Sequence, residues 1–164
     1  MKDIFIQYAS YNLWANQKFT LLINALDPSI QNQSVVSSFD SIRSTLHHMM
    51  FAENLWWQRM KLVESPSFFT EEKLEVSIIS KNLIASSEDW KNWVSKASVN
   101  ALEHEIIYHN TKKEQFKQPI SQLLLHLFNH QSYHRGQLVT LLRQCGITSI
   151  PPTDFIVWSR TKKN

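Results

Sequence analysis

The chain has 164 residues, of which 43% are hydrophobic, so it is long enough to bury a core without disulfides and corresponds to about one domain. Lys and Arg number 17 against 14 Asp and Glu, and the one dense basic run lies at residues 160–163. Nucleic-acid-binding proteins concentrate positive charge on one face, so this composition does not favour nucleic acid as a partner. Its single cysteine, Cys145, excludes an internal disulfide framework.

The first predicted element is a helix over residues 3–26. Its apolar positions recur every three or four residues, and the DPS sequence that follows ends it, because the residue before a proline is pushed out of the α region. Asp3, Gln7 and Asn12 lie where a signal peptide would have an unbroken apolar run, and no window of the chain is apolar enough to cross a membrane. We therefore predict a cytoplasmic protein without a membrane partner.

Two further helices are predicted in the middle of the chain. Ser38 can cap a helix that runs over residues 39–63, where the sequence ESPS breaks it. A third helix passes through residues 79–97, whose apolar positions are again spaced by three or four. Only two glycines and five prolines occur in the whole chain, which favours long helices over frequent tight turns.

The periodicity changes after the third helix. Over residues 102–116, β-branched and aromatic residues alternate around an NTKK turn, which predicts a short hairpin. Pro119 suits the first turn of a last long helix and Gly146 suits a left-handed stop after it, so this helix should cover residues 119–145. A short apolar segment at residues 153–160 predicts one or two further helical turns.

These elements predict an all-α fold. Four long amphipathic helices most simply form a four-helix bundle, here a single domain over residues 1–164 with a short hairpin insertion before the last long helix and a short C-terminal helix. Bundles build metal and ligand sites from side chains on facing helices. We therefore expect the chemistry in the bundle interior.

Three histidines lie four residues apart in the last long helix, within LLLHLFNHQSYHRGQL. An α-helix turns by about 100° per residue, which places His126, His130 and His134 on the stripe that should face the core. The same count in the second long helix predicts that His48 points inward and that His47 points to solvent. Because an i,i+4 pair brings two rings together, His130 and His134 with His48 form a candidate set of three nitrogen ligands.

A divalent metal ion explains why imidazoles occupy a leucine-rich stripe. Imidazole nitrogens bind zinc, nickel, copper and iron, and three protein ligands with one open position are typical of a catalytic zinc site. The alternative is that each histidine is a hydrogen-bonded core residue. We adopt that view for His126, as a neighbour that lines the pocket, and expect His104 and His109 in the hairpin to be exposed.

Other polar residues near the stripe suggest what the site does. A thermolysin-like HExxH site needs a glutamate directly after its first histidine, and Gln131 occupies that position here. Gln137, one turn past the last histidine, and Arg59, on the inward face of its helix, can hold an anionic group of a substrate. Arg135 falls on the far face of the helix and is expected to be structural.

Four stretches of the chain together resemble the DinB/YfiT-like superfamily: YNLWAN from Tyr11, SFDSIRSTLHHMMFAENLWWQRM from Ser38, NHQSYHRGQL from Asn129 and PPTDFI from Pro151. Their order and spacing span nearly the whole chain, and HxxxHRGQ is the most specific element. The resemblance implies a four-helix bundle that binds a divalent metal, often nickel or zinc, through three histidines. Carried over by position, these ligands fall on the residues that the face count selects, namely His48, His130 and His134.

The resemblance also implies an activity. Members include bacillithiol S-transferases and a mycothiol-dependent isomerase, which implies a metal-dependent thiol transferase or isomerase that uses a low-molecular-weight thiol and a small electrophilic substrate. The residues leave two alternatives open, a metal-dependent hydrolase and a non-catalytic metal- or ligand-binding stress-response dimer. The last long helix is apolar on a second face, and with the resemblance this predicts a homodimer. That face carries Leu125, Phe128, Val139 and Leu142.

Overall fold

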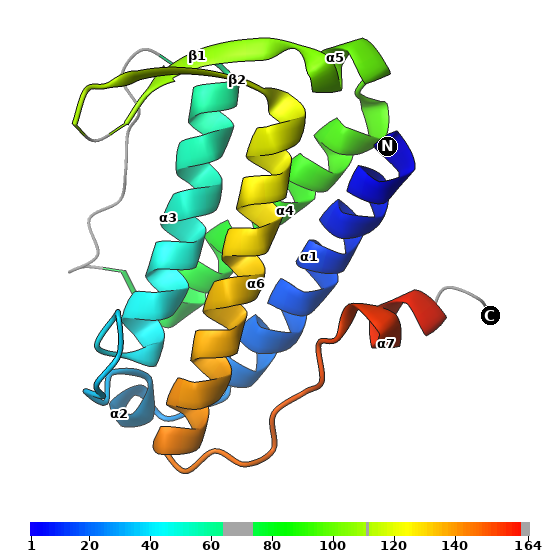
Figure 1. Ribbon diagram of the computed structural model, residues 1–164. Helices are drawn as coiled ribbons and strands as arrows, with labels where there is room; N and C mark the ends of the chain where they lie inside the picture. The colour runs from blue at the N-terminus through cyan, green and yellow to red at the C-terminus, as the bar shows by residue number, and fades with distance from the viewer. Residues whose placement is uncertain (64–73, 111, 162–164) are drawn as a thin grey trace.

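The computed structural model describes residues 1–63, 74–110 and 112–161, and its framework is a bundle of four long helices (Figure 1). These helices are α1 (Lys2–Asn24), α3 (Ile42–Met60), α4 (Val76–Lys96) and α6 (Ile120–Gln144). Both α1 and α3 contact α4 and α6, so the four helices form a closed ring around a shared core. The predicted all-α bundle is confirmed.

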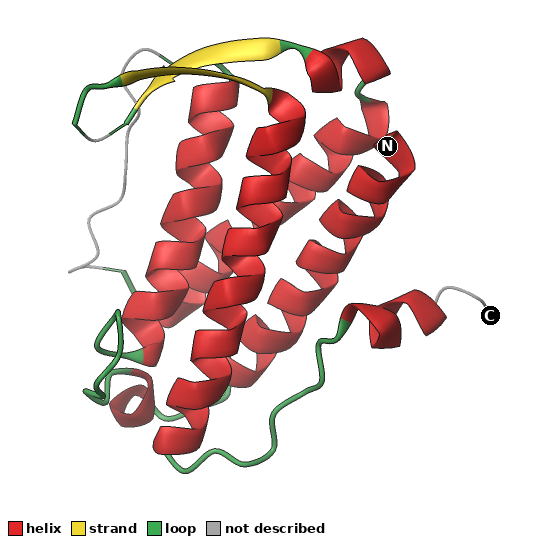
Figure 2. Ribbon diagram, viewed as in Figure 1, coloured by secondary structure: helices red, strands yellow, loops and turns green. Residues whose placement is uncertain are grey.

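The remaining elements are short and lie at the ends or on the outside of the bundle (Figure 2). They are α2 (Pro28–Gln31), α5 (Val99–Glu103), β1 (Glu105–His109), β2 (Gln115–Pro119) and α7 (Phe155–Arg160). The two strands pair antiparallel and lie across the ends of α3 and α6 (Figure 1). The hairpin before the last long helix and the C-terminal helix are thus both present.

Several predicted boundaries differ from the structure by a few residues, and local capping explains two of them, the start of α3 and the start of the hairpin. Ser41, not Ser38, caps α3, because its Oγ accepts the backbone N–H of Ser44 at 3.1 Å. The same helix ends at Met60 rather than at residue 63. The hairpin begins at residue 105 and not at 102, because Ser98 caps the short helix α5 across that stretch.

Another expectation about a side chain is also wrong. His47 is only 7% exposed, although the face count predicted that it points to solvent. The reason is that α3 packs against α4 as well as α6, so more than one of its faces is covered. The hairpin histidines, His104 and His109, are exposed as predicted.

A layer of polar residues crosses the bundle core between two apolar clusters. One cluster includes Phe5 and Trp90, and the other includes Phe19 and Leu138. Between them lie five buried polar side chains, one or two from each long helix: Asn12, Asn16, Glu53, Ser87 and Arg135. The centre of the bundle therefore holds a set of polar residues that the sequence analysis did not predict and that does not include the histidines.

Hydrogen bonds join this polar layer across the four helices. The Glu53 Oε1 atom accepts hydrogen bonds from the side-chain amides of Asn12 at 2.8 Å and Asn16 at 3.1 Å, and from Ser87 Oγ at 3.0 Å. The amide oxygens of the same two asparagines accept from Arg135 Nη1 at 2.8 and 2.9 Å. The asparagines therefore bridge a buried carboxyl group and a buried guanidinium, which confirms a structural position for Arg135.

None of the helices in the described part of the chain combines the length and apolarity that a membrane span requires.

Candidate metal centre

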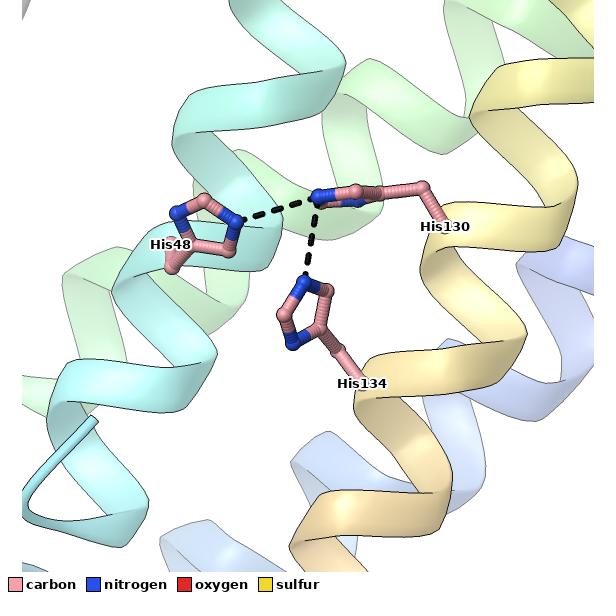
Figure 3. A group of neighbouring side chains, drawn as sticks. All are labelled: His48, His130 and His134. Atoms are coloured by element: carbon pink, nitrogen blue, oxygen red, sulfur yellow. Dashed lines mark hydrogen bonds between the residues drawn. The ribbon is translucent and has the colours of Figure 1, made fainter. Parts of the chain in front are cut away.

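Three imidazoles converge where α3 and α6 face each other (Figure 3). His48 projects from α3, while His130 and His134 lie one turn apart on α6. The Nε2 atom of His130 lies 3.1 Å from the Nε2 atom of His48 and 3.1 Å from that of His134. The structure thus brings together the three residues that the sequence predicted as ligands, and α1 and α4 lie behind them in this view.

The spacing of the three nitrogen atoms fits a shared metal ion. With metal–nitrogen bonds of about 2.0–2.1 Å, two nitrogens are about 3.3–3.4 Å apart in a tetrahedral site and about 2.9 Å apart at a right angle. The observed 3.1 Å lies between these values. All three ligand atoms lie within 4.8 Å of one another, so one ion can reach each of them.

Gln137 fixes the protonation of His134. Its Oε1 atom lies 2.7 Å from His134 Nδ1, while its Nε2 atom donates to Ser38 Oγ and to the hydroxyl of Tyr133, each at 3.1 Å. Because the amide nitrogen donates to these two hydroxyl groups, the amide oxygen faces His134 and accepts its Nδ1–H. His134 Nε2 is then unprotonated, which leaves its lone pair directed at the other two rings.

Burial also favours the neutral form of the two α6 imidazoles. Desolvation, followed by the neighbouring rings of His134 and His48, lowers the pKa of His130 to about 3. Desolvation lowers the pKa of His134 as well, against the hydrogen bond with Gln137, which raises it. Neutral imidazoles have lone pairs to offer a metal ion, and His130 Nδ1 has no hydrogen-bond partner within the described residues.

Two aromatic side chains that the sequence did not single out flank the histidines. The ring of Phe39 stacks on His48 with centroids 4.3 Å apart, and the rings of Tyr133 and His134 meet nearly at right angles with centroids 5.0 Å apart. Phe39 is the one apolar residue in the SSFDS segment, and this isolation is the signal that could have drawn attention to it. The segment remains outside α3, which lets the ring cover one side of the histidine cluster.

The three predicted pocket residues have different surroundings. Both ends of the Gln137 amide contact protein groups, so its role is to hold His134. His126 is exposed, and its ring centroid lies 5.7 Å from that of His130. Arg59 lies farther along α3, where its guanidinium carbon is 4.7 Å from the ring centre of Trp56.

The residues that follow the two α6 ligands in sequence tie this helix to its neighbours. Gln131 is fully buried and donates from Nε2 to the backbone oxygen of Met49 at 2.9 Å, next to His48 in the sequence. Arg135 is 3% exposed and belongs to the polar layer. These two contacts hold α6 against α3 and α1 beside the histidine cluster.

Glu53 is the main functional candidate that the sequence reasoning missed. Burial raises the pKa of its carboxyl group to about 7, while hydrogen bonds from Asn12 and Ser87 and the charge of Arg135 lower it. The recurrence of Asn12 and Asn16 on the buried face of the first helix was the available signal, because buried amides require polar partners.

Together, the fold and the cluster define a helical-bundle protein with three histidines placed to bind a metal ion. The DinB family matches residues 1–162. Protein DinB of Bacillus subtilis (strain 168) is 29% identical to this chain over 164 residues, a match that covers 94% of this chain and 93% of that protein. The chain therefore belongs to the DinB family, which confirms the resemblance drawn from its motifs.

Two solved structures share the fold. A DinB-like protein from Bacillus cereus ATCC 10987 superimposes with a TM-score of 0.67 at 19% identity, covering 90% of this chain and 94% of that one. A DinB-like protein from Bacillus subtilis gives a TM-score of 0.69 at 16% identity, covering 90% of this chain and 98% of that one.

Proposed function

We propose that this protein is a metal-dependent thiol transferase or isomerase that acts on small electrophiles, with His48, His130 and His134 as the metal ligands. The observation that carries the proposal is the convergence of three Nε2 atoms, with 3.1 Å between His130 and each of the other two. Three protein nitrogens leave coordination positions for a further ligand, as in catalytic sites. Nickel or zinc suits a set of three imidazoles.

The chemistry follows from what this donor set can do. A bound divalent ion would take the sulfur of a low-molecular-weight thiol and stabilise its thiolate, which is the nucleophilic form. The chain's own residues hold the site ready. Gln137 orients His134, burial keeps His130 neutral, and the Phe39 ring excludes water from one side of His48.

The residue that follows His130 in sequence favours a thiol over water as the nucleophile. Hydrolysis of an amide by water needs a general base beside the metal, and the side chain that follows the first α6 ligand is the amide of Gln131, which does not titrate. That amide also points away, since it donates to Met49 O. A thiol surrenders its own proton when it binds a metal ion, so it needs no such base.

Metal analysis and a conjugation assay test the proposal. The purified protein is expected to contain about one zinc, nickel, iron or manganese ion per chain, and His130→Ala is expected to lose it. Metal-loaded protein should join a thiol to an electrophile, and chelator-treated protein should not. Protein that contains substoichiometric metal, unchanged by His130→Ala, would refute the metal site.

The same assay decides the second candidate, a non-catalytic metal- or ligand-binding protein. If chelation lowers only the melting temperature and no turnover occurs with any thiol, the binding role is supported and the transferase is refuted. The cluster of three histidines supports this candidate equally, because it would explain metal binding without a reaction. A cytoplasmic location stays a prediction of the sequence.

Homodimerisation is a further part of the proposal. Within the predicted second apolar face of α6, Phe128 and Leu142 are buried inside the chain, whereas Leu125 is 57% exposed. Exposed Leu125 lies on the same helix as the histidines and can pack against a second copy. Light scattering at micromolar concentration should give twice the mass of one chain, and a monomer mass would refute the dimer.

A further inference from the structure

Arg59, in the last turn of α3, is a half-buried cation held by aromatic rings. Its guanidinium carbon lies 4.7 Å from the ring centre of Trp56 and 5.3 Å from that of Tyr108. Its Nη2 atom donates to the backbone oxygen of His109 in the hairpin at 2.9 Å. A guanidinium has five N–H donors, so this single hydrogen bond leaves most of them unused.

No acidic side chain in the described part of the chain neutralises this guanidinium. Elsewhere on the hairpin, Glu105 pairs with Lys117 at 2.6 Å, and Glu114 accepts from Asn110 at 2.6 Å, so both carboxylates have other partners. Burial lowers the pKa of Arg59, because desolvation disfavours its charge. A partly desolvated cation attracts an anionic ligand more strongly than an exposed one does, because the effective dielectric constant around it is lower.

Rings connect Arg59 to the metal centre. The His126 ring lies 5.2 Å from Trp56 on one side and 5.7 Å from His130 on the other. We refer to Arg59, Trp56, Tyr108 and His126 as the hairpin-end cluster. His126 is exposed and the other three are half-buried, so a ligand can reach each of them from solvent.

The charge of the cluster indicates which anion it takes. Arg59 is the one cation in contact with Trp56 and Tyr108 among the described residues, and one guanidinium charge matches one carboxylate. The planar guanidinium forms two parallel hydrogen bonds with a planar carboxylate, and the neighbouring imidazole of His126 can donate a third. A phosphate dianion would leave one of its charges unmatched by this single guanidinium.

We propose that the hairpin-end cluster is a carboxylate-binding subsite for an elongated ligand whose thiol lies at the histidine cluster. This inference rests on the proposed function, because it assigns the far end of the ligand that the metal centre would hold. Arg59 is eleven residues beyond His48 on α3, or about 16 Å along the helix axis. Since the arginine side chain shortens that path, the ligand should span roughly 10–15 Å.

A series of ω-mercaptocarboxylates of increasing chain length, each compared with its primary amide, tests the subsite on cobalt-loaded protein. The sulfur-to-cobalt charge-transfer band reports binding at the metal without any need for turnover. The carboxylate should bind about tenfold more tightly than the amide at the matching chain length. Arg59→Gln should reduce that ratio to about one, and Arg59→Lys should restore part of it.

Lys61→Gln provides the matched control. Lys61 lies two residues from Arg59 and is exposed, and its Nζ atom contacts Trp57 instead of the hairpin-end cluster, so the variant removes the same charge from the same end of α3. Its carboxylate preference should equal that of the wild type. An amide that binds as tightly as the carboxylate at every length, or a preference that survives Arg59→Gln, would overturn the subsite.

Failure of the proposed function gives a different result. If no thiol produces a charge-transfer band, the thiol chemistry is refuted, and glutarate then tests the subsite by calorimetry on the same metal-loaded protein. Glutarate should bind about tenfold more weakly to Arg59→Gln than to wild type or Lys61→Gln. Equal binding to all three proteins would overturn the subsite independently of the thiol result.

Discussion

Replacing Gln137 with methionine should weaken metal binding without unfolding the protein. Methionine has a similar shape and helix propensity but cannot accept the Nδ1–H of His134, which now ends at Gln137 Oε1 at 2.7 Å. In the metal-free variant, the imidazole proton of His134 can move to Nε2, so no buried N–H is left without an acceptor. In the metal-bound variant it cannot, because Nε2 is then a ligand, so losing the hydrogen bond destabilises only the metal-bound state.

The structure sets the size of this effect. His134 is 5% exposed, so water cannot easily replace the lost acceptor. A buried donor without a partner costs about 1–3 kcal/mol. This corresponds to the 10- to 100-fold loss of affinity, roughly, that follows removal of a hydrogen-bond partner from a ligating histidine. The same change should lower the pKa of His134 further, because the hydrogen bond with Gln137 raises it.

Competition with a chromophoric chelator at pH 7.5 measures the zinc dissociation constant. Gln122→Met, at an exposed position on the same helix, is the control and should bind zinc as the wild type does. Gln137→Glu retains an acceptor and should bind zinc at least as tightly. A zinc affinity of Gln137→Met within about twofold of the wild type would refute the conclusion that Gln137 orients His134 for metal binding.

Four more outcomes are expected. Because burial lowers the pKa of both α6 histidines, that of His130 to about 3, their protonation should not weaken zinc binding between pH 7.5 and 6, and a fall in zinc affinity of about tenfold or more would contradict this. In the metal-free protein, the contribution of His130 to the free energy of unfolding should decrease as pH falls from 6.5 towards 3, since the unfolded state binds more protons at that residue; chemical denaturation of wild type and His130→Ala should show their difference changing in this direction. The pKa of Glu53 is raised to about 7, so this residue contributes stability that is complete below pH 4.5 and is lost as pH rises through 7. In thermal melts, the melting temperature of the wild type relative to that of Glu53→Gln should therefore be higher at pH 5 than at pH 8. Gln131→Leu should lower the melting temperature by only a few degrees, about 1 kcal/mol, yet reduce zinc affinity about tenfold; unchanged affinity by competition would contradict this.

Helix geometry determines which parts of the site could be predicted from the sequence. His130 and His134 share a face of α6 because of the angle per residue alone, and that angle also selects His48 on α3. Loops have no such rule, so the position of Phe39 over His48 could not be derived from sequence. The burial of His47 depends on how many neighbours α3 has, which its own periodicity does not reveal.

Buried polar contacts also account for why the three candidate metal ligands lie between α3 and α6 and not at the centre of all four helices. Each α6 ligand is followed by a residue about 100° further round the helix, on a different face. Gln131 uses that face to bind the backbone beside His48, and Arg135 uses it to join the asparagines of α1. One face of α6 therefore supplies the ligands, while the next fixes the position of the helix against its neighbours. Because a shift of α6 by one residue would break both ties, the spacing of the three nitrogens is set by these buried polar contacts before any metal binds.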